Sequence, residues 1–253
     1  MKSKQLLKDE YVIVVETADA LAKLAAAKFV RRAQEAVENK NVFTVALSGG
    51  STPKKLYELL GGEPFRSQMP WAATHFFFGD ERGVPPDDKD SNFRMADEAM
   101  FSQLSELPQN NIHRVLAEKE ATEAADLYEQ TLRDFFSLDD NEFPRFDLVL
   151  LGMGPDGHTA SLFPHSQALT ENKRLFVENW VQKFDSYRLT LTFPAINNAR
   201  SVLFLIGGAE KAPVLNEILS SETTRDSYPA QKIKLANGEL LWLLDETAAS
   251  GLE

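Results

Sequence analysis

The 253-residue sequence contains no cysteine. Disulfide bonds, thiolate nucleophiles and cysteine-ligated metal sites are therefore excluded. No apolar run is long enough to cross a bilayer, and residues 1–10 lack the apolar segment of a signal peptide. We therefore expect a cytoplasmic protein without a membrane partner.

Positive charge is also scarce in the sequence. Lys and Arg number 27 against 38 Asp and Glu, which gives a formal net charge of -11. A broad nucleic-acid-binding surface is therefore not expected, whereas a small basic pocket for an anionic ligand is compatible with this charge. The length and the 43% of hydrophobic residues fit a globular protein. Without a clear linker, we expect one domain over residues 1–253.

Short apolar runs alternate with amphipathic segments along most of the chain. Strands are expected at residues 11–15, 42–47, 74–78, 112–116, 146–151, 175–181, 188–193, 201–206 and 240–244. Helices are expected at residues 18–39, 54–60, 92–104, 121–137 and 209–220, with a short one after the last strand. This alternation predicts an α/β fold with a doubly wound, mostly parallel, Rossmann-like sheet flanked by helices.

The strand at residues 146–151 runs into a glycine-rich turn that holds Asp156 and His158, and we expect a helix after it. Folds of this class place their chemistry at the carboxyl ends of parallel strands. Histidine is the commonest general base near neutral pH, and Asp156 is close enough in sequence to orient its ring. The alternative is a helix-capping Asp beside an incidental His.

The same turn matches the glycine spacing of a dinucleotide-binding fingerprint, with Glu178 about 20 residues further on. However, Pro164 would interrupt the helix that this fingerprint needs, and Asp156 would face the pyrophosphate. An acid–base turn is therefore the favoured interpretation.

A second turn joins the strand at residues 42–47 to the next helix. Its residues are Ser48, Gly49, Gly50, Ser51 and Thr52. Glycines let the backbone approach a ligand closely, and free amides at a helix N-terminus attract anions. The turn predicts a phosphate cradle, or alternatively a tight turn in which Thr52 caps the helix and Pro53 begins it.

Further cations follow two other strands. Arg82, in the cluster Asp80-Glu81-Arg82, offers a planar guanidinium for a carboxylate, phosphate or oxyanion. Lys183 and Arg188 offer two more positive charges. Solvated surface charges are the alternative in both places.

The other histidines carry weaker signals. His75 and His113 lie in expected strands and are expected to be packing or surface residues, whereas His165 is a peripheral site candidate. No spacing of histidines and carboxylates indicates a metal site, so no metal is expected.

Together these motifs resemble the 6-phosphogluconolactonase family. The matching stretches are residues 47–57 (LSGGSTPKKLY), 79–92 (GDERGVPPDDKDSN), 152–164 (GMGPDGHTASLFP), 183–192 (KFDSYRLTLT) and 207–212 (GGAEKA). They occur in the family's order over nearly the whole chain. The family usually has prolines between the residues matching Lys183 and Arg188, where this chain has none, so its loop is expected to differ in shape.

The resemblance implies hydrolysis of 6-phospho-D-glucono-1,5-lactone to 6-phospho-D-gluconate in the oxidative pentose phosphate pathway, without a cofactor. A monomer or homodimer is expected. His158 would be the general base, Asp156 would orient it, and Arg82 would stabilise the oxyanion or the product carboxylate. The implied substrate-binding residues are Ser48, Gly49, Gly50, Ser51, Thr52, Asp80, Lys183 and Arg188.

Glucosamine-6-phosphate deaminases are similar to this sequence at the SGGSTP and DGH stretches, and the expected fold resembles theirs. Their DGH stretch continues into Asn-Glu-Pro, where this chain has Leu162-Phe163-Pro164, so the acidic residue of a deaminase is missing. A deaminase or isomerase and a non-enzymatic sugar-phosphate sensor are the alternatives. Such sensors usually carry a DNA-binding segment, and this sequence has no basic helix-turn-helix.

Overall fold

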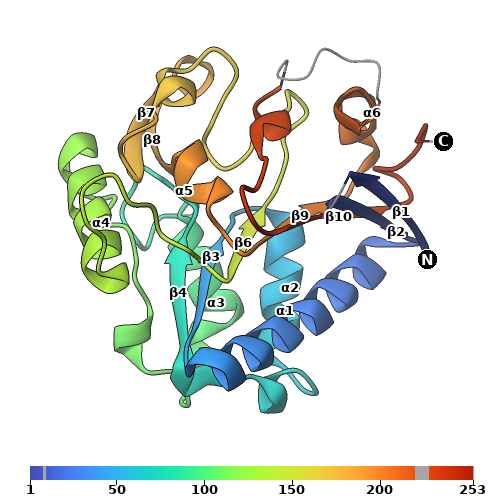
Figure 1. The fold of residues 1–253 in the computed structure, drawn as a ribbon, viewed down its shortest axis with the longest axis horizontal. Helices are drawn as coiled ribbons and strands as arrows, with labels where there is room; N and C mark the ends of the chain where they lie inside the picture. The colour runs from blue at the N-terminus through green and yellow to red at the C-terminus, as the bar shows by residue number, and fades with distance from the viewer. Residues whose placement is uncertain (8–9, 220–227, 253) are drawn as a thin grey trace.

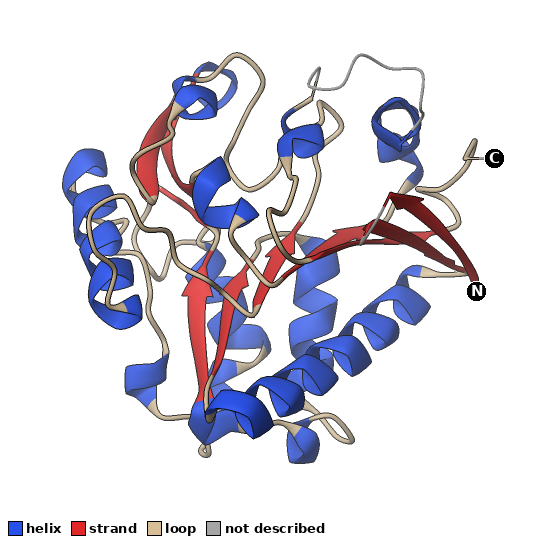
Figure 2. Ribbon diagram, viewed as in Figure 1, coloured by secondary structure: helices blue, strands red, loops and turns tan. Residues whose placement is uncertain are grey.

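The computed structural model describes residues 1–7, 10–219 and 228–252. These residues form two β-sheets with helices around them (Figures 1 and 2). The larger sheet has the strand order β1-β2-β10-β9-β6-β3-β4, and the smaller has the order β5-β8-β7. All neighbours in the large sheet are parallel except β1 and β2, whereas the small sheet is antiparallel.

The strands of the large sheet are β1 (Lys2–Leu7), β2 (Glu10–Val15), β3 (Phe43–Leu47), β4 (Thr74–Phe78), β6 (Leu148–Leu151), β9 (Ser201–Ile206) and β10 (Glu239–Asp245). Those of the small sheet are β5 (Asp80–Arg82), β7 (Phe176–Val181) and β8 (Ser186–Leu191). The α-helices are α1 (Ala18–Lys40), α2 (Ser51–Gly61), α3 (Asn92–Ala99), α4 (Ala121–Phe136), α5 (Phe193–Asn197) and α6 (Ala212–Leu219).

The central strands of the large sheet are buried because helices cover both of its faces. Every residue of β3, β6 and β9 is buried, as expected for apolar runs in a parallel sheet. In Figure 1, α1 and α2 lie below this sheet, and α5 and α6 lie above it. No described helix combines the length and apolar character needed to cross a bilayer. These features confirm the predicted fold class.

The small sheet corrects one expectation. The strands predicted at residues 175–181 and 188–193 exist, but as β7 and β8 they pair with β5 outside the parallel sheet. The second one ends at Leu191, and α5 begins at Phe193. Its alternation of polar and apolar residues already differs from the continuous apolar runs of the large sheet, and alternation is typical of a half-buried antiparallel strand.

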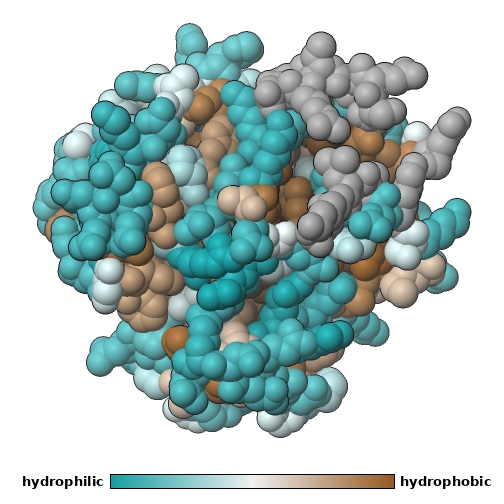
Figure 3. Space-filling view, in the orientation of Figure 1, coloured by the Kyte–Doolittle hydropathy of each residue, from teal (hydrophilic) through white to brown (hydrophobic). Residues whose placement is uncertain are grey.

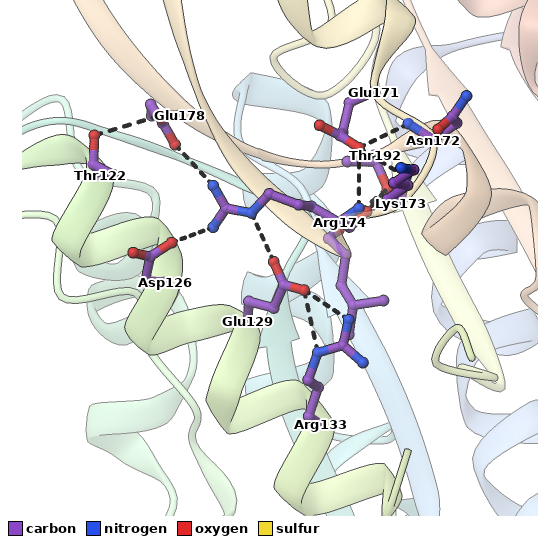
Figure 4. Close-up of polar contacts among 11 residues, drawn as sticks. Thr122, Asp126, Glu129, Arg133, Glu171, Asn172, Lys173, Arg174, Glu178 and Thr192 are labelled. Atoms are coloured by element: carbon purple, nitrogen blue, oxygen red, sulfur yellow. Dashed lines mark hydrogen bonds and ion pairs between the residues drawn. The ribbon is translucent and has the colours of Figure 1, made fainter. Parts of the chain in front are cut away.

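Helix α4 supports the small sheet through one ion-pair network, shown in Figure 4. The guanidinium of Arg174, just before β7, contacts carboxylates of Asp126 and Glu129 on α4 and of Glu178 on β7, at 2.5, 2.9 and 3.4 Å. Beneath it, the ring of Tyr128 packs edge-on against Phe176. The network therefore anchors β7 to α4.

Several local predictions were wrong. Residues 112–116 form no strand, since only Ile112 makes an isolated bridge, to Phe76. No helix follows the 152–158 turn, and the residues after β10 form turns instead of a helix. The strand β1 was not predicted. The helix predicted at residues 92–104 ends at Ala99. The helix predicted at residues 209–220 begins only at Ala212, as α6, and residue 220 of that prediction lies outside the described ranges.

Candidate active site

A cavity of about 230 Å³ opens where the carboxyl ends of β3, β4, β6 and β9 meet. Side chains of β5 and β8 line it as well. Of the catalytic and substrate-binding residues predicted from the sequence, all but Asp156 and Lys183 line the cavity; the peripheral candidate His165 does not. Three turns and two strands that are far apart in the sequence therefore converge on one space. The face of the molecule seen in Figure 3 is largely hydrophilic, with smaller apolar patches.

The turn at residues 48–52 forms one wall and opens helix α2. The helix begins at Ser51, with Gly50 as its N-cap at φ 106° and no side chain capping the first amides. The prediction that Thr52 caps this helix was therefore wrong, because Thr52 lies inside the first turn. With no cap and no acidic residue in the first turn, the free amides and the helix dipole favour an anion here.

Buried contacts hold this turn in place. The hydroxyl of Tyr57 accepts a hydrogen bond from Ser48 N at 3.0 Å and donates one to Ser48 O at 2.8 Å. A Cβ at Gly49 would lie 2.0 Å from Oδ1 of Asn92, whose Nδ2 donates to Asp80 O at 2.9 Å. Glycine is therefore required at position 49, and the amides are oriented before any ligand arrives.

The turn after β6 presents the Asp156–His158 pair. His158 Nδ1 lies 2.5 Å from Asp156 Oδ1, and the imidazole lines the cavity while Asp156 lies behind it. An ionised carboxylate accepts a hydrogen bond from Nδ1–H. This fixes the tautomer in which Nε2 is unprotonated and can act as the base. A Cβ at Gly154 would lie 2.1 Å from the imidazole Cε1, so the ring position depends on this glycine.

Charge around Asp156 keeps it ionised. Burial raises the pKa of Asp156, but the hydrogen bond and charge of His158, with a contribution from Lys183, lower the pKa below its ordinary value. Lys183 Nζ lies 3.5 Å from Asp156 Oδ2, and its side chain is largely exposed. Lys183 therefore contacts Asp156 from outside the cavity and does not line it.

Two arginines form the opposite wall. Arg82 and Arg188 are paired residues across the antiparallel β5–β8 register. Arg82 Nη1 donates to Asp90 O, while the buried Nε of Arg188 has no partner. Burial lowers the pKa of Arg188, and the charge of Arg82 lowers it further. Neither guanidinium takes part in an ion pair among the described residues, so both positive charges can attract an anion, although Asp90 O uses one donor of Arg82.

The acidic neighbours of Arg82 have structural partners. Asp80 and Glu81 are 7% and 2% exposed, so a solvated charge cluster is the wrong interpretation. Asp80 Oδ2 accepts from Ser161 Oγ at 2.7 Å, and the Glu81 carboxylate accepts the amide of Asn92 at the start of α3 at 2.7 Å. Burial raises the pKa of Glu81. Both carboxylates therefore shape the wall that carries Arg82.

Sequence reasoning missed Lys211 as a site residue. It follows β9, lines the cavity near the 48–52 turn, and donates from Nζ to Gly207 O at 2.9 Å. The signal was present in the sequence, because a buried strand runs into Gly207-Gly208 as the other site strands run into their turns. Lys211 adds a third cation to the cavity.

The other histidines lie outside the cavity. His75 Nδ1 and His113 Nε2 are 3.1 Å apart, and Phe77 stacks on His113 at 4.3 Å, so these two pack as predicted. Burial and the charge of His75 lower the pKa of His113 to about 4. His165 does not line the cavity. Within the described ranges, no three metal-binding side chains are arranged to hold a metal ion.

Residues 16–242 match the family model described as glucosamine-6-phosphate isomerases/6-phosphogluconolactonase. The chain is 46% identical over 222 residues to a 6-phosphogluconolactonase of Synechocystis sp., covering 87% of this chain and 89% of that one. It is 41% identical over 254 residues to a 6-phosphogluconolactonase of Nostoc sp., covering 100% and 98%. The structure of 6-phosphogluconolactonase from Trypanosoma brucei is similar with a TM-score of 0.86 and 32% identity, covering 96% and 98%. The chain belongs to the glucosamine-6-phosphate isomerase/6-phosphogluconolactonase family.

Proposed function

We propose that the protein hydrolyses 6-phospho-D-glucono-1,5-lactone to 6-phospho-D-gluconate, a step of the oxidative pentose phosphate pathway. The observation that carries this proposal is the Asp156–His158 pair at a cavity that also holds three cations and a free helix N-terminus. Such a cavity suits a phosphorylated substrate whose other end needs a general base. The names of the similar proteins agree with this activity.

In the proposed reaction, His158 Nε2 takes a proton from a water molecule as the water oxygen bonds to the lactone carbonyl carbon. The negative charge of the tetrahedral intermediate then falls on the former carbonyl oxygen, where the guanidinium of Arg82 stabilises it. As the bond from this carbon to the ring oxygen breaks, the imidazolium returns its proton to that oxygen. Asp156 orients the imidazole and stabilises its charged form throughout.

The phosphate is assigned to the amides at the start of α2, with the hydroxyl groups of Ser51 and Thr52 and the ammonium of Lys211. These groups all line the cavity, and Gly207, whose carbonyl accepts from Lys211 Nζ, lies close enough to Thr52 that a Cβ there would be 3.7 Å from Thr52 Oγ1. Arg82 and Arg188 then meet the lactone end or the product carboxylate, since their paired positions on β5 and β8 place them together. Lys183 acts on Asp156 in this assignment and does not hold phosphate.

The deaminase alternative requires a carboxylate where this chain has Phe163. That side chain is 7% exposed and stacks on the His158 ring at 4.1 Å. An apolar ring therefore occupies the place of the acid, which favours hydrolysis. Monomer or homodimer and a cytoplasmic location remain predictions from the sequence.

The test is an assay of 6-phosphogluconate formation from freshly prepared lactone, corrected for spontaneous hydrolysis. His158→Gln should lower kcat by about 10²- to 10⁴-fold, because it keeps a hydrogen-bonding group but loses the base. His165→Ala is the matched control and should leave kcat unchanged, since His165 lies outside the cavity. Ammonia release from glucosamine 6-phosphate without lactone hydrolysis would contradict the proposal.

A further inference from the structure

Phe184 is an exposed aromatic ring at the mouth of the cavity. It lies in the 3₁₀ turn Gln182–Phe184 between β7 and β8, and it is 44% exposed although it lines the cavity. The chain reverses at the next residue, Asp185, with φ 47°. A large aromatic ring that stays exposed loses the stabilisation that burial would provide. We therefore ascribe the exposed position of Phe184 to a role in the site.

The Phe184 ring lies between the Arg188 guanidinium and the ring of Phe163. The guanidinium carbon of Arg188 is 4.8 Å from its centroid, and the ring of Phe163 meets it edge-on at 5.7 Å and 76°. Phe163 in turn stacks on the imidazole of His158 at 4.1 Å and 25°. A continuous series of contacts thus joins the proposed base to the arginine wall.

The contact matters because the carboxylates near Arg188 attract its charge only from a distance and none of them pairs with the guanidinium. Its buried Nε has no partner, and no carboxylate among the described residues forms an ion pair with it. Its paired residue across the strands is Arg82, which repels it. A carboxylate partner would hold the guanidinium but would also neutralise it, whereas an aromatic face attracts the cation and leaves its N–H groups to a ligand.

We propose that Phe184 is a positioning residue that holds the Arg188 guanidinium in the cavity for an anionic group of the ligand. This inference rests on the proposed function only in taking that ligand to be a sugar phosphate lactone or its acid product. Phe184 touches neither His158 nor Asp156. Its second cation, Lys183 with Nζ 5.6 Å from the ring centroid, does not line the cavity, so loss of the ring should act mainly on ligand binding and much less on proton transfer.

The hairpin offers a matched control. Trp180 and Tyr187 are also exposed, at 46% and 43%, and their rings contact each other at 5.0 Å. Neither lines the cavity. Tyr187→Leu therefore removes an exposed ring from the same hairpin without affecting the contact with Arg188.

The experiment measures the Kd of 6-phosphogluconate and of inorganic phosphate by calorimetry, and kcat and KM for the lactone. Phe184→Leu keeps an apolar side chain but loses the ring, so Kd and KM should rise about 5- to 10-fold with kcat within about twofold of the parent value. Phe184→Tyr should restore both constants, and Tyr187→Leu should leave them unchanged. In an Arg188→Met background, Phe184→Leu should have no further effect.

Unchanged constants in Phe184→Leu, or the same loss in Phe184→Tyr, would overturn the inference. An equal effect of Phe184→Leu in the Arg188→Met background would also overturn it, because the ring would then act without Arg188. The calorimetric arm does not depend on turnover. If the parent protein failed to hydrolyse the lactone, the proposed function would fail while the comparison of Kd values would still test Phe184.

Discussion

The large sheet places its functional groups through backbone turns, whereas the small sheet places long side chains. The 48–52 turn and the turn holding His158 follow β3 and β6, whose residues are all buried. Arg82 and Arg188 instead extend from β5 and β8, and the first half of β8 is only partly buried. The first arrangement is rigid because close packing surrounds it, and the second depends on side-chain contacts.

This difference matches the two tasks of the proposed reaction. Proton transfer needs a base held within a narrow range of distance and angle, which the packed turn after β6 supplies. Binding of an anion tolerates more adjustment, because charge attraction falls off gradually with distance. Changes in the turn after β6 should therefore act mainly on kcat, and loss of Arg188 from the small sheet mainly on KM.

The strongest test of the large sheet is Gly154→Ala. The added Cβ would lie 2.1 Å from the His158 ring, so the imidazole must move. We expect kcat to fall by about 10²-fold, since a displacement of about 1 Å can have this effect on a catalytic group. Gly62→Ala is the matched control, because its Cβ would meet only ordinary contacts, the shortest at 3.5 Å. Steady-state kinetics with a normal kcat in Gly154→Ala would contradict the rigid-turn argument.

For the small sheet, Arg188→Ala removes one of the paired cations. KM should rise about 10- to 100-fold, the range expected for losing a charged hydrogen bond, with a smaller change in kcat. Arg31→Ala removes an arginine that is exposed and pairs only within α1, so its kinetics should match those of the parent. A fall in kcat at constant KM would place Arg188 with the chemistry and break the division between the two sheets.

The smallest effect is expected from Arg174→Met, which loosens the small sheet without touching the cavity. Three carboxylates lose their shared partner, so the free energy of unfolding should fall by about 1 kcal/mol and the Tm by about 2–4 °C. KM should rise about twofold with kcat unchanged, since β7 pairs with the strand that carries Arg188. Thermal unfolding and kinetics check both effects, with Arg31→Met as the control. An unchanged Tm would show that α4 holds β7 by apolar packing alone.

Local signals in the sequence were sufficient for the parallel strands of the large sheet, though not for its antiparallel edge strand β1. The continuous apolar runs predicted β3, β6 and β9, and the polar turns after them followed from the parallel fold. The helix expected after His158 was wrong because Pro164 interrupts that segment, a signal the sequence already carried. Lys211 was missed because a lysine after two glycines is not distinctive without its neighbours in space.

The sequence by itself determined the strand-and-helix alternation, the Asp156–His158 spacing and the glycines that both turns require. These features depend on residues close together in the chain, so local conformational preferences are enough to reveal them. Only the tertiary structure decided that Arg82 lies opposite Arg188 and that Phe184 contacts that guanidinium. The physical reason is that strand pairing and side-chain contacts between distant segments are set by packing, which no local pattern specifies.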